Sequence, residues 1–181
     1  MYLIIGIIFI LLTITIIYYN RIKSCEMRVQ EGYSGIDVAL SKRYNVITNL
    51  VEVVKGYSKH EKETFELVIK SRNEQLVTRS EYESQLNETV TQLIALSESY
   101  PKLQSSEQYL MLQRALADTE EHLQAARRLY NHNVSKLNQT ISMFPGSIIN
   151  GIAKAKPATF YEAQFEERIL PTVSFDIIEK R

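Results

Sequence analysis

Residues 2–19 form one uncharged, mostly apolar run at the N-terminus, and this run constrains the fold more than any other feature. The first charged side chain in the sequence is that of Arg21. As a helix, the run would extend about 27 Å, close to the ~30 Å hydrocarbon thickness of a bilayer. Hydrocarbon offers the backbone no hydrogen-bond partner, so a single span there has to be helical. The run therefore predicts a transmembrane helix.

A retained anchor competes with two other interpretations of this run. A cleavable secretory signal has a positive start, about 7–15 apolar residues and a small-residue cleavage site. Here only Met1 precedes a longer run, and residues 18–21 offer no such site. Cys25 raises the possibility of a lipoprotein, but Lys23 and Ser24 separate it from the run. We therefore predict a transmembrane signal-anchor over residues 1–20, in which the membrane-facing residues are Tyr2, Leu3, Ile4, Ile5, Ile7, Ile8, Phe9, Ile10, Leu11, Leu12, Ile14, Ile16, Ile17, Tyr18 and Tyr19.

The basic residues beside the run predict its orientation. Arg21, Lys23 and Arg28 follow the run within the distance over which Lys and Arg bias insertion, and no basic side chain precedes it. This bias predicts that the N-terminus lies outside and the body in the cytoplasm. Cys25 is the only cysteine, so no intrachain disulfide can form, which agrees with a reducing compartment.

The remaining chain has balanced charge and few helix breakers. Lys plus Arg number 21 and Asp plus Glu number 21, which gives a net charge of +0. Phosphate binding needs a basic face, so this balance argues against a nucleic-acid partner. Six glycines and four prolines mark no linker. We expect one domain after the anchor.

Apolar periodicity predicts helices nearly throughout. Steps of three and four place one apolar stripe on a first body helix, at Tyr33, Ile36, Leu40, Tyr44, Ile47, Val51 and Val54. A second helix should start near residue 58 and end before Pro101, with a possible bend in its polar middle, residues 72–83. Its apolar positions are Phe65, Val68, Leu76, Leu86, Val90, Leu93 and Leu96.

The C-terminal half predicts a third long helix and then a change of character. The third helix should run from about Ser105 to Phe144 and stop at Pro145-Gly146. Residues 147–153 predict a short fourth helix. Beyond Pro157 the apolar residues are spaced as in an extended segment, and those at 173, 175 and 177 alternate with polar ones as in a strand.

These elements predict an all-α protein, in which an N-terminal transmembrane helix is followed by an antiparallel bundle of long helices. The bundle has three long helices, a short fourth and an extended C-terminal tail, because long helices with one apolar stripe each must pair side by side. The predicted division is a signal-anchor over residues 1–20, a juxtamembrane connector over 21–32, a bundle over 33–153 and a tail over 154–181 that packs on the bundle.

Polar residues beside the apolar stripes predict a network between helices. Glu120, Arg127, Asn131 and Asn138 fall within about 20° of one line on the third helix. Asp37 and Arg43 flank the stripe of the first body helix in the same way, so we expect Asp37 to meet Arg127 or Arg43 to meet Glu120. The structural interpretation, that these ions fix the register of long helices, is favoured over a ligand site.

No motif in the sequence predicts a catalytic, cofactor-binding or metal site. His60-Glu61 begins like a zinc-protease motif, but Thr64 stands where its second histidine would be. His122 and His132 are ten residues apart and face different directions on one helix. We expect neither a cofactor nor a reaction.

Two stretches resemble the LemA family. The first is the run from Asp37 to Tyr57, continued by His60-Glu61. The second comprises Tyr100-Pro101, Thr119-Glu120, Ala126-Arg127, Tyr130-Asn131, Asn138, Ile141 and Phe144-Pro145, and the ending with Phe160, Pro171, Val173 and Phe175 also fits. Thr48 stands where the family commonly has proline, and Gln104-Ser105 where a Lys-Ala pair is usual. The resemblance implies a bacterial single-pass inner-membrane protein with a bundle of long helices, no known reaction, and a recurrent set comprising Asp37, Arg43, Glu120, Arg127 and Asn131.

The leading functional hypothesis is a membrane-tethered scaffold or adaptor whose helical faces bind unidentified protein partners beside the lipid bilayer. An alternative is a membrane-bound ligand sensor or enzyme that uses the polar line from Glu120 to Asn138. A third hypothesis places the body outside the membrane as an envelope protein. Self-association into a homo-oligomer is compatible with a long neutral bundle.

Overall fold

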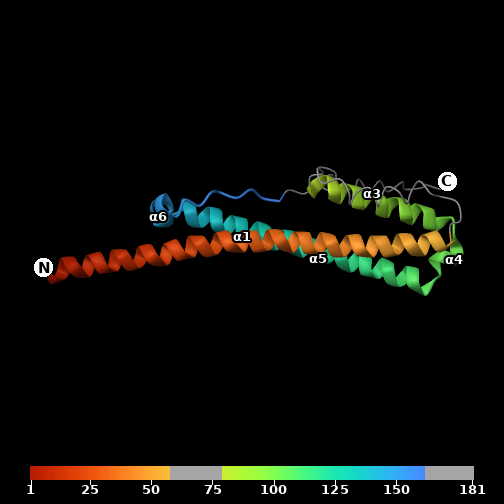
Figure 1. Ribbon diagram of the computed structural model, residues 1–181, viewed down its shortest axis with the longest axis horizontal. Helices are drawn as coiled ribbons and strands as arrows, with labels where there is room; N and C mark the ends of the chain where they lie inside the picture. The colour runs from red at the N-terminus through yellow and green to blue at the C-terminus, as the bar shows by residue number, and fades with distance from the viewer. Residues whose placement is uncertain (58–78, 162–181) are drawn as a thin grey trace, which may run out of the picture.

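The computed structural model of the protein describes residues 1–57 and 79–161, and within them every regular element is an α-helix (Figure 1). The described helices are α1 (Tyr2–Tyr57), α3 (Arg79–Glu98), α4 (Pro101–Gln104), α5 (Glu107–Ser142) and α6 (Gly146–Ala153). The prediction of an all-α bundle with a long apolar N-terminal helix is confirmed. The first part of the predicted second helix, residues 58–78, lies outside the described residues.

Helix α1 is a single 56-residue helix, so the anchor and the first bundle helix are one element. The sequence boundaries at residues 20 and 32 do not coincide with any interruption of the helix. The chain changes from apolar to amphipathic at Arg21, but no proline follows before Tyr57, and a change of surroundings alone does not break backbone hydrogen bonds. Within residues 21–32, Ile22 and Cys25 are buried in the fold.

The main core lies between α1 and α5, which run side by side in opposite directions (Figure 1). Ile36, Ile47 and Leu50 of α1 are fully buried, as are Leu123 and Val134 of α5. A Cβ added at Gly32 would lie 3.1 Å from the Tyr130 Cα atom, which shows how closely the two helices approach. The predicted stripes therefore meet each other in a long seam.

Helix α3 lies along the half of the bundle farthest from the N-terminus, beside α1, and α4 lies at that far end (Figure 1). Helix α3 ends before Pro101, as predicted, and Leu86 and Leu93 of α3 join the main core. The Tyr109 hydroxyl donates a 2.7 Å hydrogen bond to Ser97 Oγ, which ties the end of α3 to the start of α5. The Ser106 hydroxyl accepts from the backbone N–H of Tyr109 and caps α5.

At the opposite end, α5 stops just before Pro145-Gly146, and α6 turns back against α1. Any side chain at Gly146 would overlap the Thr140 carbonyl oxygen, so this close turn requires glycine. A second core cluster forms here around Ile22 and Cys25, with Leu137, Ile141, Ile149, Ala153 and Ala155. Lys154 ends α6 in the left-handed conformation, with φ 53°.

Residues 154–161 then run back along α5 without helical structure (Figure 1). Their contacts with α5 place this part of the predicted tail on the bundle. The rest of the tail, including the strand-like alternation at residues 173–177, lies outside the described residues.

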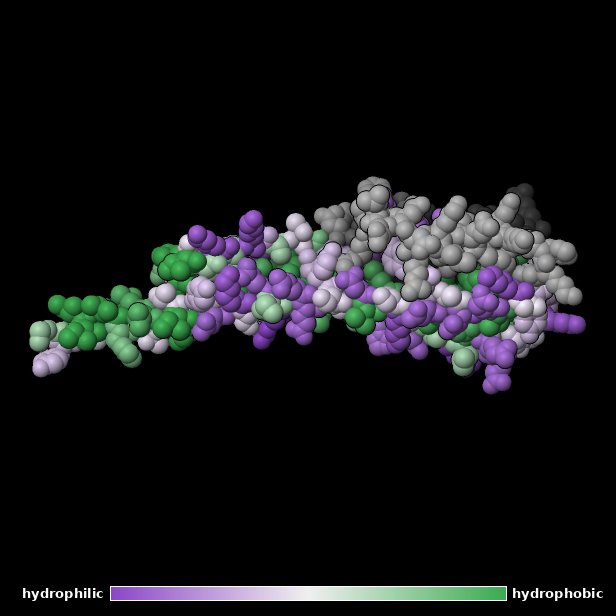
Figure 2. Space-filling model, in the orientation of Figure 1, coloured by the Kyte–Doolittle hydropathy of each residue, from purple (hydrophilic) through white to green (hydrophobic). Residues whose placement is uncertain are grey.

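Among the described helices, α1 is the one that is long and apolar enough to span a membrane. The large apolar side chains of residues 2–12 are all at least 50% exposed. Figure 2 shows them as an apolar rod that projects beyond the mixed surface of the bundle. This part of α1 therefore makes no core with the bundle.

Candidate functional site

Two groups of polar residues are candidates for a functional site: the seam between the bundle helices, where the sequence predicted a network, and a pocket at the end of the bundle nearest the apolar rod. In the seam, Arg43 of α1 forms a 2.7 Å ion pair with Glu120 of α5, between Nη1 and Oε2. The Arg43 side chain is 8% exposed and the Glu120 side chain 38%. Of the two predicted contacts, the one between Arg43 and Glu120 is therefore present.

Arg127 of α5 forms an ion pair with Glu83 of α3, a carboxylate that the sequence analysis did not select. Both side chains are buried, at 8% and 2% exposed. The Tyr161 hydroxyl donates a 2.7 Å hydrogen bond to Glu83 Oε2, and the Arg127 guanidinium lies 5.3 Å from the centroid of the Tyr161 ring. Asp37, the partner expected for Arg127, lies on the exposed side of α1.

The sequence did contain a signal for Glu83. It precedes Leu86, Val90 and Leu93 by three, seven and ten residues, so it lies on the apolar stripe of its own helix. A carboxylate at such a position has to be buried, and a buried carboxylate needs a cation. Arg127 is that cation.

Asn131 and Asn138 bind the backbone of the stretch that follows α6. Asn138 Nδ2 donates to the Ala158 carbonyl and its Oδ1 accepts from the Ala158 N–H, both at 2.9 Å. Asn131 makes the same pair of bonds to Tyr161, at 3.0 and 2.8 Å. Each asparagine side chain thus bonds both the N–H and the carbonyl of one residue, as the backbone of a neighbouring strand would.

The spacing of these two clamps follows from backbone geometry. Asn131 and Asn138 are seven residues apart on α5, about 10.5 Å at 1.5 Å per residue. Ala158 and Tyr161 are three residues apart in an extended chain, about 10 Å at ~3.3 Å per residue. The two distances match, so both clamps engage at once. Asn150 clamps Ala155 in the same way, through bonds of 3.1 and 2.9 Å.

The polar line on α5 is therefore satisfied by the protein itself. Glu120 and Arg127 form ion pairs across helices, and the two asparagines bind the chain between α6 and Tyr161. These contacts support the interpretation that the polar groups fix the register of the helices.

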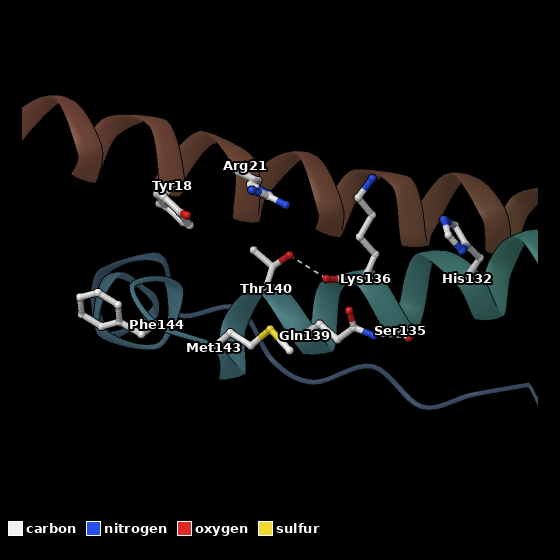
Figure 3. Close-up of a pocket in the computed structure, with 9 residues that line it drawn as sticks. All are labelled: Tyr18, Arg21, His132, Ser135, Lys136, Gln139, Thr140, Met143 and Phe144. Atoms are coloured by element: carbon white, nitrogen blue, oxygen red, sulfur yellow. Dashed lines mark hydrogen bonds between the residues drawn. The ribbon is translucent and has the colours of Figure 1, made fainter.

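The pocket lies between α1 and the C-terminal part of α5, where the apolar rod meets the bundle (Figure 3). Its volume is about 430 Å³, and it is lined by Tyr18, Arg21, His132, Ser135, Lys136, Gln139, Thr140, Met143 and Phe144. Figure 3 shows Arg21 extending along α1 in the direction of Lys136, while Lys136 extends from α5 up toward α1. Among the described residues, no carboxylate lies within ion-pair distance of either cation.

The pocket was not predicted from the sequence. Arg21 was considered only for its effect on orientation, His132 was set aside as a metal ligand, and Lys136 was not among the predicted site residues. His132, Lys136 and Thr140 lie four residues apart on one flank of α5, which a sequence can show. Their meeting with Arg21, more than 100 positions away, depends on the packing of α6 and α5 on α1.

The described residues contain no group of three or more His, Cys, Asp or Glu side chains that would hold a metal ion. Cys25 is buried, with its Sγ atom 3.9 Å from Thr140 Oγ1. The chemistry available in the pocket is therefore that of two cations, a histidine and several hydroxyl and amide groups, which suits an anion.

Comparison with known proteins relates this chain to one family. The model of the LemA family matches residues 32–175. The protein LemA of Metamycoplasma hominis is 26% identical over 150 residues, which cover 76% of this chain and 68% of that protein. The residues matched by the family model include α3, α5, α6 and residues 32–57 of α1.

Proposed function

The chain belongs to the LemA family, and from this premise we propose that it is a membrane-tethered helical scaffold that binds protein partners at the cytoplasmic face of the bacterial inner membrane. The observation that supports this most is the continuity of α1. One end of this helix exposes an apolar run long enough to cross a bilayer, and the other end forms the core of the bundle. Anchor and scaffold are thus one rigid element.

The exposed run needs an apolar environment. Contiguous apolar surface of this extent is rare on a soluble monomer, because water disfavours it by about 25 cal/mol per Å². A bilayer provides that environment for a helix of this length. Tyr18 and Tyr19 then lie at the interface, where aromatic side chains are enriched.

The fold strengthens the case for a cytoplasmic body. Arg21, Lys23 and Arg28 lie at the end of the bundle nearest the apolar rod, and the fold brings Lys136 to the same end. Lys154 and Lys156 also lie there, on either side of Ala155 in the second core cluster. A hydrogen bond from Lys23 to Glu26 raises the pKa of Lys23 above its ordinary value, which already lies far above neutral pH, so nothing around this side chain removes its positive charge. Basic residues concentrated beside a span favour the cytoplasmic side.

A partner has an exposed face of α5 available to it. Met111 and Leu129 are 61% and 57% exposed. They are eighteen residues apart, which is five full helical turns, so they point in the same direction. These two exposed apolar side chains offer a partner two contact points on the same side of α5.

Site-specific crosslinking tests this proposal. A photoreactive amino acid is placed at Met111 or Leu129 in the full-length protein, and light is applied to intact cells. We expect both positions to give the same discrete adduct, because one partner covers one face. Position Glu52, on the exposed side of α1, is the control and should not give that adduct. Adducts that are absent, or equal at all three positions, in correctly folded protein would refute the proposed scaffold role.

The alternative, a ligand sensor or enzyme on the polar line of α5, has less support. Its asparagines and charged residues already bind the protein itself.

A further inference from the structure

We infer that the end of the bundle beside the apolar rod binds the headgroup of an anionic phospholipid, while α6 and the turn before it lie in the interfacial layer of the bilayer. This inference rests on the membrane anchoring proposed above and adds a specific lipid class and a second membrane contact. The residues concerned are the pocket cations Arg21 and Lys136 and an apolar group, defined here as the α6 patch, which comprises Met143, Phe144, Ile148 and Ile152.

The α6 patch is exposed although it is apolar. Met143 is 62% exposed, Phe144 80%, Ile148 69% and Ile152 66%. Ile149 and Ala153, on the other side of the same short helix, are buried in the second core cluster. Helix α6 is therefore apolar on two faces, and one of them remains uncovered by any described residue of the protein.

The position of the α6 patch identifies the bilayer as what covers it. Helix α6 packs beside Ile22 of α1, immediately after the apolar run, and Tyr18 packs against the same cluster. Phe144 and Tyr18 line the same pocket, so the patch lies at the level of the interfacial tyrosines. Figure 2 shows the apolar atoms of α6 next to the apolar rod of α1, so the two surfaces meet one bilayer.

The pocket has the charge and size for a phospholipid headgroup. Arg21 and Lys136 approach it from facing helices, and His132, Ser135 and Gln139 add polar groups. Arginine and lysine are the side chains that bind phosphate oxygens. A basic pocket between helices on the cytoplasmic side, beside a span, is the setting in which proteins bind anionic lipid headgroups. The pocket opens where such headgroups lie, with the α6 patch positioned to contact the acyl chains.

The chain contains no tryptophan, so a single introduced tryptophan reports its own depth. Three variants of the full-length protein are reconstituted in nanodiscs that contain lipids with brominated acyl chains, which quench tryptophan on contact. Phe144→Trp tests the α6 patch, Phe9→Trp tests the anchor, and Leu110→Trp at the far end of α5 is the control. We expect strong quenching and blue-shifted emission for the first two and neither for the third.

Headgroup selectivity is measured with the Phe144→Trp protein. Quenching by brominated phosphatidylglycerol is compared with quenching by brominated phosphatidylcholine at the same mole fraction. We expect enrichment of the anionic lipid, by about fivefold for each basic side chain near the surface. Adding Arg21→Gln and Lys136→Gln should lower this preference by about fivefold for each side chain replaced, whereas Lys102→Gln and Arg114→Gln at the far end should leave it unchanged. A preference that Arg21→Gln and Lys136→Gln do not change refutes the headgroup site. Nanodiscs expose both bilayer faces, so orientation does not affect the comparison.

Each failure has its own meaning. Quenching at Phe9→Trp without quenching at Phe144→Trp refutes the interfacial position of α6 and leaves the anchor intact. No quenching at Phe9→Trp refutes the anchoring itself. Equal quenching by the two lipids refutes the headgroup site. A preference that inorganic phosphate abolishes, while chloride at the same ionic strength does not, assigns the pocket to a soluble anion and overturns the lipid assignment.

Discussion

The buried ion pair between Glu83 and Arg127 illustrates how single residues specify this bundle. Both charges leave water, and their mutual attraction only roughly offsets the loss of solvation. Tyr161 improves the balance, because it donates to Glu83 and places its ring near the guanidinium. The contact joins α3, α5 and the stretch after α6, so a helix that slid by one turn would leave both charges buried without each other.

Removing one charge of this pair should destabilise the protein far more than removing both. We expect Glu83→Gln to lower the free energy of unfolding by about 3–5 kcal/mol, because Arg127 then remains buried without its partner. The double variant Glu83→Leu, Arg127→Met should lower the free energy of unfolding by less than Glu83→Gln does. Urea unfolding of the full-length protein in detergent micelles, followed by circular dichroism, measures both. Glu98→Gln, at an exposed position of the same helix, should change stability by less than about 0.5 kcal/mol. Equal losses for Glu83→Gln and Glu98→Gln would contradict the prediction.

At the residue scale, the sequence predicted contacts between the facing sides of two helices better than contacts that depend on how the chain turns after a helix. The pair Arg43–Glu120 followed from the angular positions of two side chains on two helices. Glu83 could have been identified by the same reasoning, but it was missed because residues 72–83 were treated as a polar bend. The asparagine clamps were not predictable, since they depend on where an extended chain crosses α5 after a turn at Gly146.

At the scale of elements, the closest approach of α1 and α5 is at Gly32. A Cβ there would lie 3.1 Å from the Tyr130 Cα atom and 3.3 Å from Asn133 Nδ2. Asn133 Nδ2 also donates a 2.9 Å hydrogen bond to the Arg28 carbonyl, a contact between helices that needs this proximity. A glycine inside a helix costs about 1 kcal/mol relative to alanine. Here the close contact between two helices is the compensating gain.

A matched pair of glycine variants tests this approach. We expect Gly32→Val to destabilise the protein by about 1–3 kcal/mol, because the new side chain pushes against the backbone of α5. Gly35→Val should be neutral or slightly stabilising, since a Cβ at Gly35 meets nothing within 4 Å. Thermal unfolding of the two variants in the same detergent gives the comparison. Equal destabilisation by both would show that helix propensity, and not the contact with Tyr130, decides the effect.

Helix ends were predictable where proline or glycine marks them, as at Pro101 and Pro145-Gly146. The continuity of α1 was not, because the sequence boundary at Arg21 reflects a change of surroundings and not of backbone. The pocket could not be predicted from the sequence either, because Arg21 and Lys136 become neighbours only when α5 and α6 pack on α1.

At the scale of the whole molecule, the orientation in the membrane decides which partners can reach the bundle. We expect a C-terminal green fluorescent protein fusion to fluoresce and a C-terminal alkaline phosphatase fusion to be inactive, since the body is proposed to be cytoplasmic. Replacing Arg21, Lys23 and Arg28 together by glutamine should raise the inverted fraction, because these residues bias insertion. Replacing Lys102 alone should not. An active phosphatase fusion to the unaltered protein would place the body outside the membrane.

With residues 2–19 in the bilayer, as proposed, the unbroken α1 would convert a tilt of the anchor into a sideways displacement of the bundle. Its part beyond residue 20 is about 55 Å long at 1.5 Å per residue. Membrane helices tilt by about 20° on average, and the tilt increases as the bilayer becomes thinner than the apolar run. For a rod of this length, a tilt of about 20° displaces the far end sideways by about 19 Å. Local bilayer thickness would thus set how far the proposed partner-binding face of α5 is displaced along the membrane surface.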